Sequence, residues 1–138
     1  VTSGANIAIE LSQRSRSTVS CVGGQISSST LSLSGPQAEA FLATVNIDTA
    51  VLAATGYSAG AGFTVGSYTE NSLKRRVIQK ADKVILLIDR SKLGRTLPFT
   101  FASLSDIDVV ICDAPLPEDF IQSARAAGTE VLQVQPAK

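Results

Sequence analysis

Residues 84–92 read Val-Ile-Leu-Leu-Ile-Asp-Arg-Ser-Lys, and the first five of them decide the fold class. A continuous run of apolar residues is typical of a strand that is buried on both faces of a parallel sheet. Runs of the same kind recur at residues 49–54, 109–112 and 131–134, and stretches with helical spacing lie between them. We therefore expect an α/β fold, a mostly parallel, Rossmann-like sheet with helices on both faces.

The composition limits the kinds of site that the chain can build. Its 138 residues suit one domain, and 44% apolar with 17% charged residues is a globular composition. The sequence has no histidine, which excludes a Ser-His-Asp triad, a Cys-His nucleophile and any histidine metal site. Two cysteines are too few for a four-thiolate zinc site. We expect residues 1–138 to form a single domain that holds neither a metal nor another cofactor.

The start of the chain and its hydropathy bear on where the protein works. The chain begins at Val1 and contains no methionine, so we expect a fragment or a processed chain. It has no apolar run of about 18 residues, which a membrane-spanning helix needs. The first residues also lack the charged and apolar regions of a signal peptide. We therefore expect a cytoplasmic protein without a membrane partner.

Charge is concentrated in one segment of a chain that is neutral overall. Residues 74–95 contain eight basic and two acidic side chains, whereas the rest of the chain holds four basic and ten acidic ones. A local basic block favours a site for a small anion over a general nucleic-acid surface. The block also lacks aromatic residues on which bases could stack, so we do not expect this chain itself to bind DNA.

Helices and one glycine-rich loop are expected between the strands. The helices are predicted at residues 4–13 with Ser3 as cap, after Gly35-Pro36, from Ser67 or Thr69 to Lys80, and from 117 to Ala127, where Gly128 ends the last one. Residues 56–66 carry four glycines, which predicts a long mobile loop, either a flexible lid or a surface connection. Residues 18–22 indicate a strand, and residues 25–34 either an edge strand or a loop. The tail from residue 135 is expected to fray.

Ligands of open parallel sheets bind outside the carboxyl ends of the strands. The candidate binding residues therefore follow the expected strands, and they are Thr2, Ser3, Gly4, Gly23, Gly24, Gly56 and Lys92. Hydroxyls and free backbone N–H groups before a helix suit a phosphate, although these turns also read as simple helix caps, tight turns or solvated loops. Asp89 is expected either to orient Lys92 or to cap the turn that follows it.

The third expected helix carries two charges on its apolar side. An apolar stripe that includes Leu73 and Ile78 extends toward the amino end onto Glu70 and Lys74. These two charges either pair with each other or contact a polar ligand. Arg75 lies at the border of the stripe and is an alternative cation for the same ligand.

Six short blocks occur in a familiar order along nearly the whole chain. They are Gly23-Gly24, Leu33-Ser34-Gly35-Pro36, Gly62-Phe63-Thr64, Glu70 with Lys74-Arg75, Asp89-Arg90-Ser91-Lys92-Leu93-Gly94 and Leu104-Ser105-Asp106-Ile107-Asp108. Together they resemble the effector-sensing domain of DeoR-type bacterial transcription regulators. The resemblance implies a Rossmann-like sensor, related to ribose-5-phosphate isomerase and to aminosugar-phosphate deaminases, that binds a phosphorylated sugar or a related metabolite.

The same resemblance implies parts that this chain lacks. DeoR-type regulators bind DNA through an N-terminal winged helix-turn-helix, and family members usually have a helix and most of a strand before the position of Thr2. Both are expected to be absent here, so DNA would be a partner only through the missing domain. Regulators of this kind usually self-associate, and we expect a homo-oligomer.

The resemblance also assigns roles to individual residues. It places Thr2, Ser3 and Gly4 in a phosphate pocket, Gly23 and Gly24 at its floor, Glu70, Lys74 and Arg75 near the sugar, and Lys92 near the phosphate. Two positions depart from the family pattern. Ser3 stands where members often have Asn, and Arg90 stands where many have Ser, which leaves the size and polarity of the pocket open.

We expect ligand sensing rather than catalysis. The related isomerases need a carboxylate base near the position of Lys74, and residues 55–66 contain no acidic residue at all. In this hypothesis, ligand binding closes the loop at residues 56–66 and alters the DNA affinity of the missing domain. Two alternatives stay open, namely a sugar-phosphate isomerase or deaminase with Glu70 or Asp113 as base, and an oligomerisation module with a vestigial pocket.

Overall fold

The computed structural model describes residues 1–134 of the chain. The chain divides into two compact units, Val1–Val45 and Asn46–Lys138. Within the described residues, no helix is long and apolar enough to cross a membrane. The frayed tail that we expect from residue 135 lies outside the described part of the chain.

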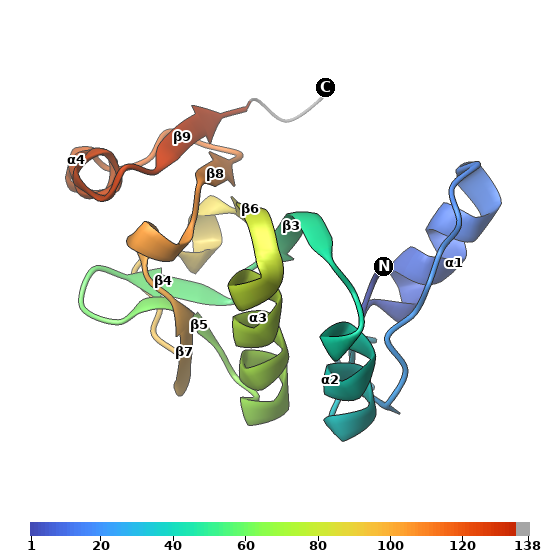
Figure 1. Cartoon of the computed structure of the whole chain (residues 1–138). Coiled ribbons are helices and arrows are strands. Elements are labelled where there is room, and N and C mark those ends of the chain that lie inside the picture. The colour runs from blue at the N-terminus through green and yellow to red at the C-terminus, as the bar shows by residue number, and fades with distance from the viewer. Residues whose placement is uncertain (135–138) are drawn as a thin grey trace. The chain divides into compact units, whose positions relative to one another are not determined.

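The first unit contains two helices and a small hairpin (Figure 1). Its elements are α1 (Ala5–Arg14), β1 (Gln25–Ile26), β2 (Leu33–Ser34) and α2 (Pro36–Ala43). β1 and β2 pair antiparallel, so residues 25–34 form a hairpin rather than an unpaired loop. Pro36 opens α2 in its first turn, as the sequence predicts. Ala38 and Leu42 of α2 are buried, whereas α1 buries none of its residues.

Two local predictions for this unit are wrong. Ser3 does not cap α1, because Gly4 holds the cap position and no side chain bonds the first turn. Residues 18–22 do not form a regular strand. The backbone of Thr2 bonds that of Ser20 at 2.9 Å and that of Val22 at 3.1 Å, which leaves one isolated parallel bridge. A β-prone run becomes a strand only where a partner pairs along its length.

The second unit is built on a parallel sheet, which confirms the predicted α/β class. Its strands, in spatial order, are β3 (Ile47–Ala53), β6 (Ala81–Ile88), β8 (Val109–Cys112) and β9 (Glu130–Gln133). All neighbouring pairs run parallel. Helix α3 (Tyr68–Lys80) leads directly into β6, and α4 (Glu118–Ala127) connects β8 to β9 (Figure 1). Gly128 ends α4 in the left-handed conformation, as predicted.

One face of this sheet carries most of the core of the unit. Val84, Leu86 and Ile88 of β6 are buried together with Val110 of β8. Leu87 belongs to the opposite face and is 42% exposed, so the expectation that residues 84–88 are buried on both faces is wrong. A continuous apolar run identifies a strand, but burial depends on which elements cover each face.

A second, antiparallel sheet replaces the predicted loop at residues 56–66. Its strands, in spatial order, are β4 (Gly56–Ser58), β5 (Gly62–Val65) and β7 (Phe99–Ala102). The hydroxyl of Thr64, a fully buried residue, donates to the carbonyl of Gly56 at 3.2 Å and accepts from the N–H of Leu97 at 3.1 Å. The predictions of a mobile loop and of a closing lid are therefore wrong. The glycines serve a tight hairpin, in which Gly62 has a φ of +74°.

Aromatic rings join the antiparallel sheet to α4. The ring centroid of Tyr57 lies 4.8 Å from that of Phe63 and 4.8 Å from that of Phe120. Phe63 in turn lies 6.4 Å from Phe101 of β7. Each such buried side chain contributes about 1.5–3 kcal/mol by leaving water. The β4–β5 hairpin is thus part of the core of this unit.

Candidate functional site

The carboxyl end of β6 is tied to that of its neighbour β8. Arg90 donates its backbone N–H to Oδ1 of Asp113, the residue directly after β8, at 3.0 Å. Asp89 accepts the N–H of Ser91 at 2.8 Å and so caps the short 3-10 helix η1 (Arg90–Lys92). The capping role predicted for Asp89 is confirmed.

Lys92 is held at this strand end by a carboxylate, so the orienting role predicted for Asp89 is confirmed as well. The Lys92 Nζ lies 3.6 Å from Oδ2 of Asp89, and the lysine side chain is 30% exposed. A hydrogen bond from the Ser91 hydroxyl, with a smaller contribution from the charge of Lys92, lowers the pKa of the Asp89 carboxyl. An exposed pair of this length is weak, so the ammonium can exchange its partner for an anionic ligand at little cost.

Glu70 and Lys74 pair with each other near the amino end of α3. The Lys74 Nζ lies 2.9 Å from Oε1 of Glu70, and the two side chains are only 15% and 22% exposed. The same ammonium donates to the carbonyl of Ala53, the last residue of β3, and lies 5.0 Å from the ring centroid of Phe101. Lys74 therefore lies at the carboxyl end of a parallel strand, where the sequence places it, and it already has protein partners there.

Arg75 lies in different surroundings from Lys74. It is exposed and lines a groove of about 290 Å³ between α3, β7 and the 3-10 helix η2 (Leu104–Asp106). Within residues 1–134 it forms no ion pair. The structure thus separates the two cations that the sequence offers as alternatives for one ligand.

In the first unit, the turn before α1 leaves donors open. The Gly4 N–H donates to Oγ1 of Thr2 at 3.1 Å, and the carbonyl of Ser3 accepts from the N–H of Leu33 at 2.7 Å. The N–H groups of Asn6 and Ile7, in the first turn of α1, bond no group within residues 1–134. Open N–H groups at the start of a helix suit an anion.

The candidate glycines have clear conformational reasons to be glycine. Gly23 and Gly24 have φ values of +76° and +97°, and a Cβ on Gly24 would collide with the carbonyl oxygen of Ser34. A Cβ on Gly56 would collide with the carbonyl oxygen of Arg95. These facts support the tight-turn interpretation. Contact of the three glycines with a ligand stays a prediction.

The second unit therefore brings together some of the predicted residues. Glu70 and Lys74 form one pair, Lys92 lies beside Asp89, and Gly56 begins β4 shortly after β3 ends. The remaining candidates lie in the first unit, and they are Thr2, Ser3, Gly4, Gly23 and Gly24. No group of three or more Cys, Asp or Glu side chains within residues 1–134 is placed to hold a metal ion.

Sequence reasoning names Asp113 only as a candidate base, and it misses Asn71. Asp113 has a positioning role, because it holds η1 against the end of β8, and the acid directly after a predicted strand is the signal for it. Asn71 is only 9% exposed, and its Oδ1 has no hydrogen-bond partner. Its place in α3, next to Glu70 in sequence, gives no signal that distinguishes it from a surface residue.

The parallel sheet, its covering helices and the polar strand ends together define the chain as a Rossmann-like α/β protein with candidate anion-binding residues at one sheet edge. Residues 1–114 match the family model of the DeoR C terminal sensor domain, and the chain belongs to this family. The resemblance drawn from the sequence motifs is thereby confirmed.

Relatives of this chain are transcription regulators by name. The chain is 36% identical over 132 residues to the HTH-type transcriptional regulator GlpR of Haloferax volcanii, which covers 96% of this chain and 51% of the relative. It is 30% identical over 132 residues to the HTH-type transcriptional repressor GlcR of Bacillus subtilis, with coverage of 96% and 51%. It is 28% identical over 122 residues to the glycerol-3-phosphate regulon repressor of Escherichia coli, with coverage of 88% and 48%. The chain thus spans about half the length of these curated relatives.

Proposed function

We propose that this chain is the effector-sensing part of a DeoR-type transcription regulator. A phosphorylated sugar or a related metabolite binds it and changes the DNA affinity of a winged helix-turn-helix domain that lies outside this chain. Membership of the sensor-domain family supports this function. So do the names of relatives, which include a repressor of a glycerol-3-phosphate regulon.

The observation that carries the proposal is the position of two ammonium groups at the carboxyl ends of neighbouring strands. β3 and β6 are adjacent and parallel, with Ala53 opposite Leu87. Lys74 bonds the last carbonyl of β3, and Lys92 follows the end of β6. Both cations therefore belong to the same edge of the sheet, where a phosphate gains charge-assisted hydrogen bonds.

Lys74 serves this ligand better than Arg75. Lys74 lies at the sheet edge, whereas Arg75 faces the groove beside β7. Glu70 holds the Lys74 ammonium in place through Oε1, and its second carboxylate oxygen can accept a hydrogen bond from a sugar hydroxyl while this pair is kept. The proposal also assigns Gly56 to this ligand. Contact of a ligand with Thr2, Ser3, Gly4, Gly23 and Gly24 of the first unit stays a prediction from the sequence.

We further propose that the site binds without catalysis. Glu70 is paired with Lys74 at 2.9 Å, and Asp113 accepts the N–H of Arg90 at 3.0 Å. A general base needs a carboxylate that is free to take a proton from the substrate. Both candidate bases are instead engaged with groups of the protein, and the named relatives are regulators.

Calorimetry with a panel of metabolites tests the proposal. The panel holds glycerol 3-phosphate, ribose 5-phosphate, glucose 6-phosphate and glucosamine 6-phosphate, each beside its unphosphorylated counterpart. We expect binding of at least one phosphorylated compound and none of its counterpart. Lys92→Ala and Lys74→Ala should each weaken it by about tenfold or more, because a charged hydrogen bond contributes about 1.5–3 kcal/mol. Arg125→Ala, an exposed change on α4, is the control.

Two results would overturn the proposal. One is the absence of binding heat with every compound for a chain that is folded by circular dichroism. The other is turnover of a bound compound that disappears in Glu70→Gln, which would establish the enzyme alternative. In the full-length regulator, the bound compound should change DNA affinity by about 5- to 150-fold, the usual range of allosteric coupling.

A further inference from the structure

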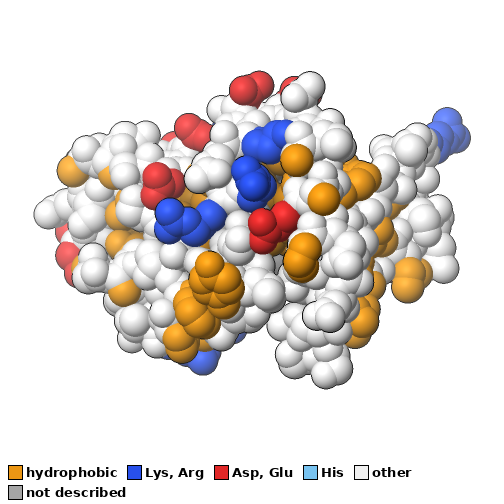
Figure 2. Space-filling model, turned by 60° about the horizontal axis from the view of Figure 1, so that its bottom comes forward, with side chains coloured by type: hydrophobic (Ala, Val, Ile, Leu, Met, Phe, Trp, Pro, Cys, Tyr) orange, Lys and Arg blue, Asp and Glu red, His pale blue; other side chains and the backbone are white. Residues whose placement is uncertain are grey.

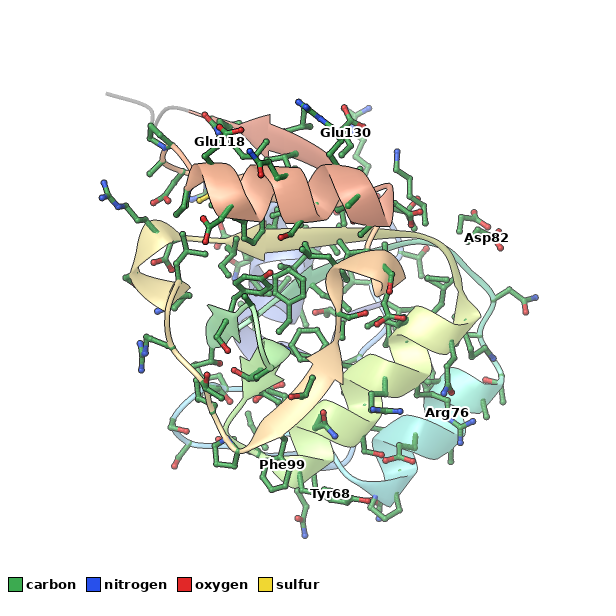
Figure 3. All side chains as sticks on the ribbon, turned by 90° about the vertical axis from the view of Figure 1, so that its left-hand side faces the viewer. Tyr68, Arg76, Asp82, Phe99, Glu118 and Glu130 are labelled. Carbon is green, nitrogen blue, oxygen red and sulfur yellow. The ribbon has the colours of Figure 1, made fainter. Side chains whose placement is uncertain are left out.

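Strand β7 has an open edge next to helix α3. Within residues 1–134, β7 pairs with β5 on one side and with no strand on the other. Tyr68 begins α3 and Phe99 begins β7, and their rings meet edge to face with centroids 5.7 Å apart. Figure 3 shows these two labelled side chains together at one end of the helix and the strand. Farther along, Gln79 of α3 and Ala102 of β7 line one groove, so helix and strand run side by side in the same direction.

This groove combines an apolar floor with polar walls. It has a volume of about 290 Å³, and Ile78 of α3 and Phe101 of β7 are its large apolar residues. Phe101 is only 4% exposed, whereas Arg75 and Thr100 are exposed. On the face that includes the start of α3, apolar side chains lie next to basic and acidic ones (Figure 2). Such a surface offers both apolar contact area and a charge to an occupant.

Arg75 is the charge in this groove that lacks a partner. Arg14, Lys74 and Lys92 each pair with a carboxylate, whereas Arg75 forms no ion pair with any residue of 1–134. The groove also contains Asp106, but one of its oxygens already accepts the N–H and the hydroxyl of Ser103, at 2.8 and 2.7 Å. Arg75 is therefore the charged side chain of the groove that has no partner within residues 1–134, and a carboxylate complements it.

The backbone of β7 indicates the shape of the occupant. An unpaired strand edge presents a row of N–H and C=O groups that another extended chain can bond. Peptides bind in this way where a groove lies beside an open strand edge, with backbone bonds giving affinity and side-chain pockets giving specificity. At one rise per residue, the four residues of β7 span about 13 Å and residues 68–79 of α3 span about 18 Å, so the helix wall extends along the whole strand edge.

We propose that the groove between α3 and β7 binds an extended acidic peptide. The peptide adds as a strand to the open edge of β7 and places a carboxylate against Arg75. Its apolar side chains pack on Ile78, on the exposed ring of Tyr68 and on the partly buried ring of Phe99. The inference uses residues of the second unit alone and does not depend on the effector proposed above.

Selection from a library of blocked, randomised octapeptides against the immobilised chain tests this inference. We expect the enriched peptides to carry β-branched residues at every second position and to have one Asp or Glu at a common position. Fluorescence polarisation should show binding that falls at least tenfold in Arg75→Glu. Arg76→Glu is the matched control, because Arg76 is the next residue, carries the same charge and does not line the groove (Figure 3).

N-methylated peptides distinguish backbone pairing with β7 from a purely electrostatic attraction to Arg75. N-methylation of alternate peptide residues should abolish binding in one register and leave it in the other, because only every second N–H of an added strand faces β7. The inference is overturned if no peptide is enriched, or if enriched peptides bind Arg75→Glu as well as the unmodified chain. It is also overturned if inorganic phosphate alone binds at Arg75, since the occupant is then a small anion. Circular dichroism of each variant verifies that it is folded.

Discussion

The buried hydroxyl of Thr64 offers a sharp test of the hairpin at residues 56–66. Thr64 is fully buried, donates to the carbonyl of Gly56 at 3.2 Å and accepts from the N–H of Leu97 at 3.1 Å. In Thr64→Val the shape of the side chain is kept, but both hydrogen bonds are lost and the Leu97 N–H has no acceptor. Each lost bond costs about 1 kcal/mol, and leaving the part-buried Leu97 N–H without an acceptor adds up to about 2 kcal/mol. We therefore expect the free energy of unfolding to fall by about 2–4 kcal/mol.

Urea denaturation followed by circular dichroism measures this loss. With a slope of about 2 kcal/mol per molar urea, the middle of the usual range, the midpoint should fall by about 1–2 M at unchanged slope. Thr64→Ser is the matched control, because it keeps the hydroxyl and removes one methyl group, at a cost of about 1 kcal/mol. If Thr64→Val is as stable as Thr64→Ser, the two bonds carry no net stability and the hairpin is not locked by this side chain.

Three further predictions follow from described residues. Gly128→Ala should lower stability by about 1 kcal/mol in thermal melts, because Gly128 has a φ of +79°, although a Cβ there would meet no other atom. Gly60→Ala is the control and should not lower stability, because a Cβ on Gly60 would also meet no atom and its φ is not positive. Ellman's reagent should modify the exposed Cys21 quickly and Cys112 only on unfolding, because Cys112 is buried and burial raises the pKa of its thiol. Fast modification of Cys112 in the folded Cys21→Ala variant would refute this. The Ser91 hydroxyl lowers the pKa of the Asp89 carboxyl in the folded chain. The Asp89 carboxylate should therefore stabilise the fold at pH values above its unfolded-state pKa, and this stabilisation should disappear as the pH falls through its folded-state pKa. Urea midpoints of Asp89→Asn and the unmodified chain should then converge in acid, and a constant difference across pH would contradict it.

The strands and helices that local pattern specifies could be predicted from the sequence. The run at residues 84–88 identifies β6, Ser67 caps α3 by accepting the Glu70 N–H, and Gly128 ends α4. The hairpin at residues 56–66 could not be recognised, because four glycines read as a loop when their packing partners are unknown. Gly56 and Gly62 are needed since a Cβ on either would meet the backbone of a residue in the 95–102 region, about 40 positions away.

The same distinction applies to the candidate site: contacts within one helix could be predicted, and contacts with segments distant in sequence could not. Helical spacing alone places Glu70 and Lys74 on one side of α3, and the structure pairs them. The surroundings of Arg75 depend on β7, a strand that lies outside the helix and was not predicted. The fully buried Thr64 likewise bonds Leu97, which is distant in sequence. Contacts between distant segments are what a single sequence leaves undetermined.

The ammonium of Lys74 also limits what can bind beside it. A protonated lysine has three N–H groups, and here one is directed to Glu70 and one to the carbonyl of Ala53. One proton remains for an incoming molecule. A ligand that accepts one hydrogen bond from Lys74 can bind without disturbing α3. A ligand that accepts two must break the bond of Lys74 either to Glu70 or to the carbonyl of Ala53 at the end of β3. The number of hydrogens on one nitrogen thus separates ligands that merely occupy this edge from those that shift the helix.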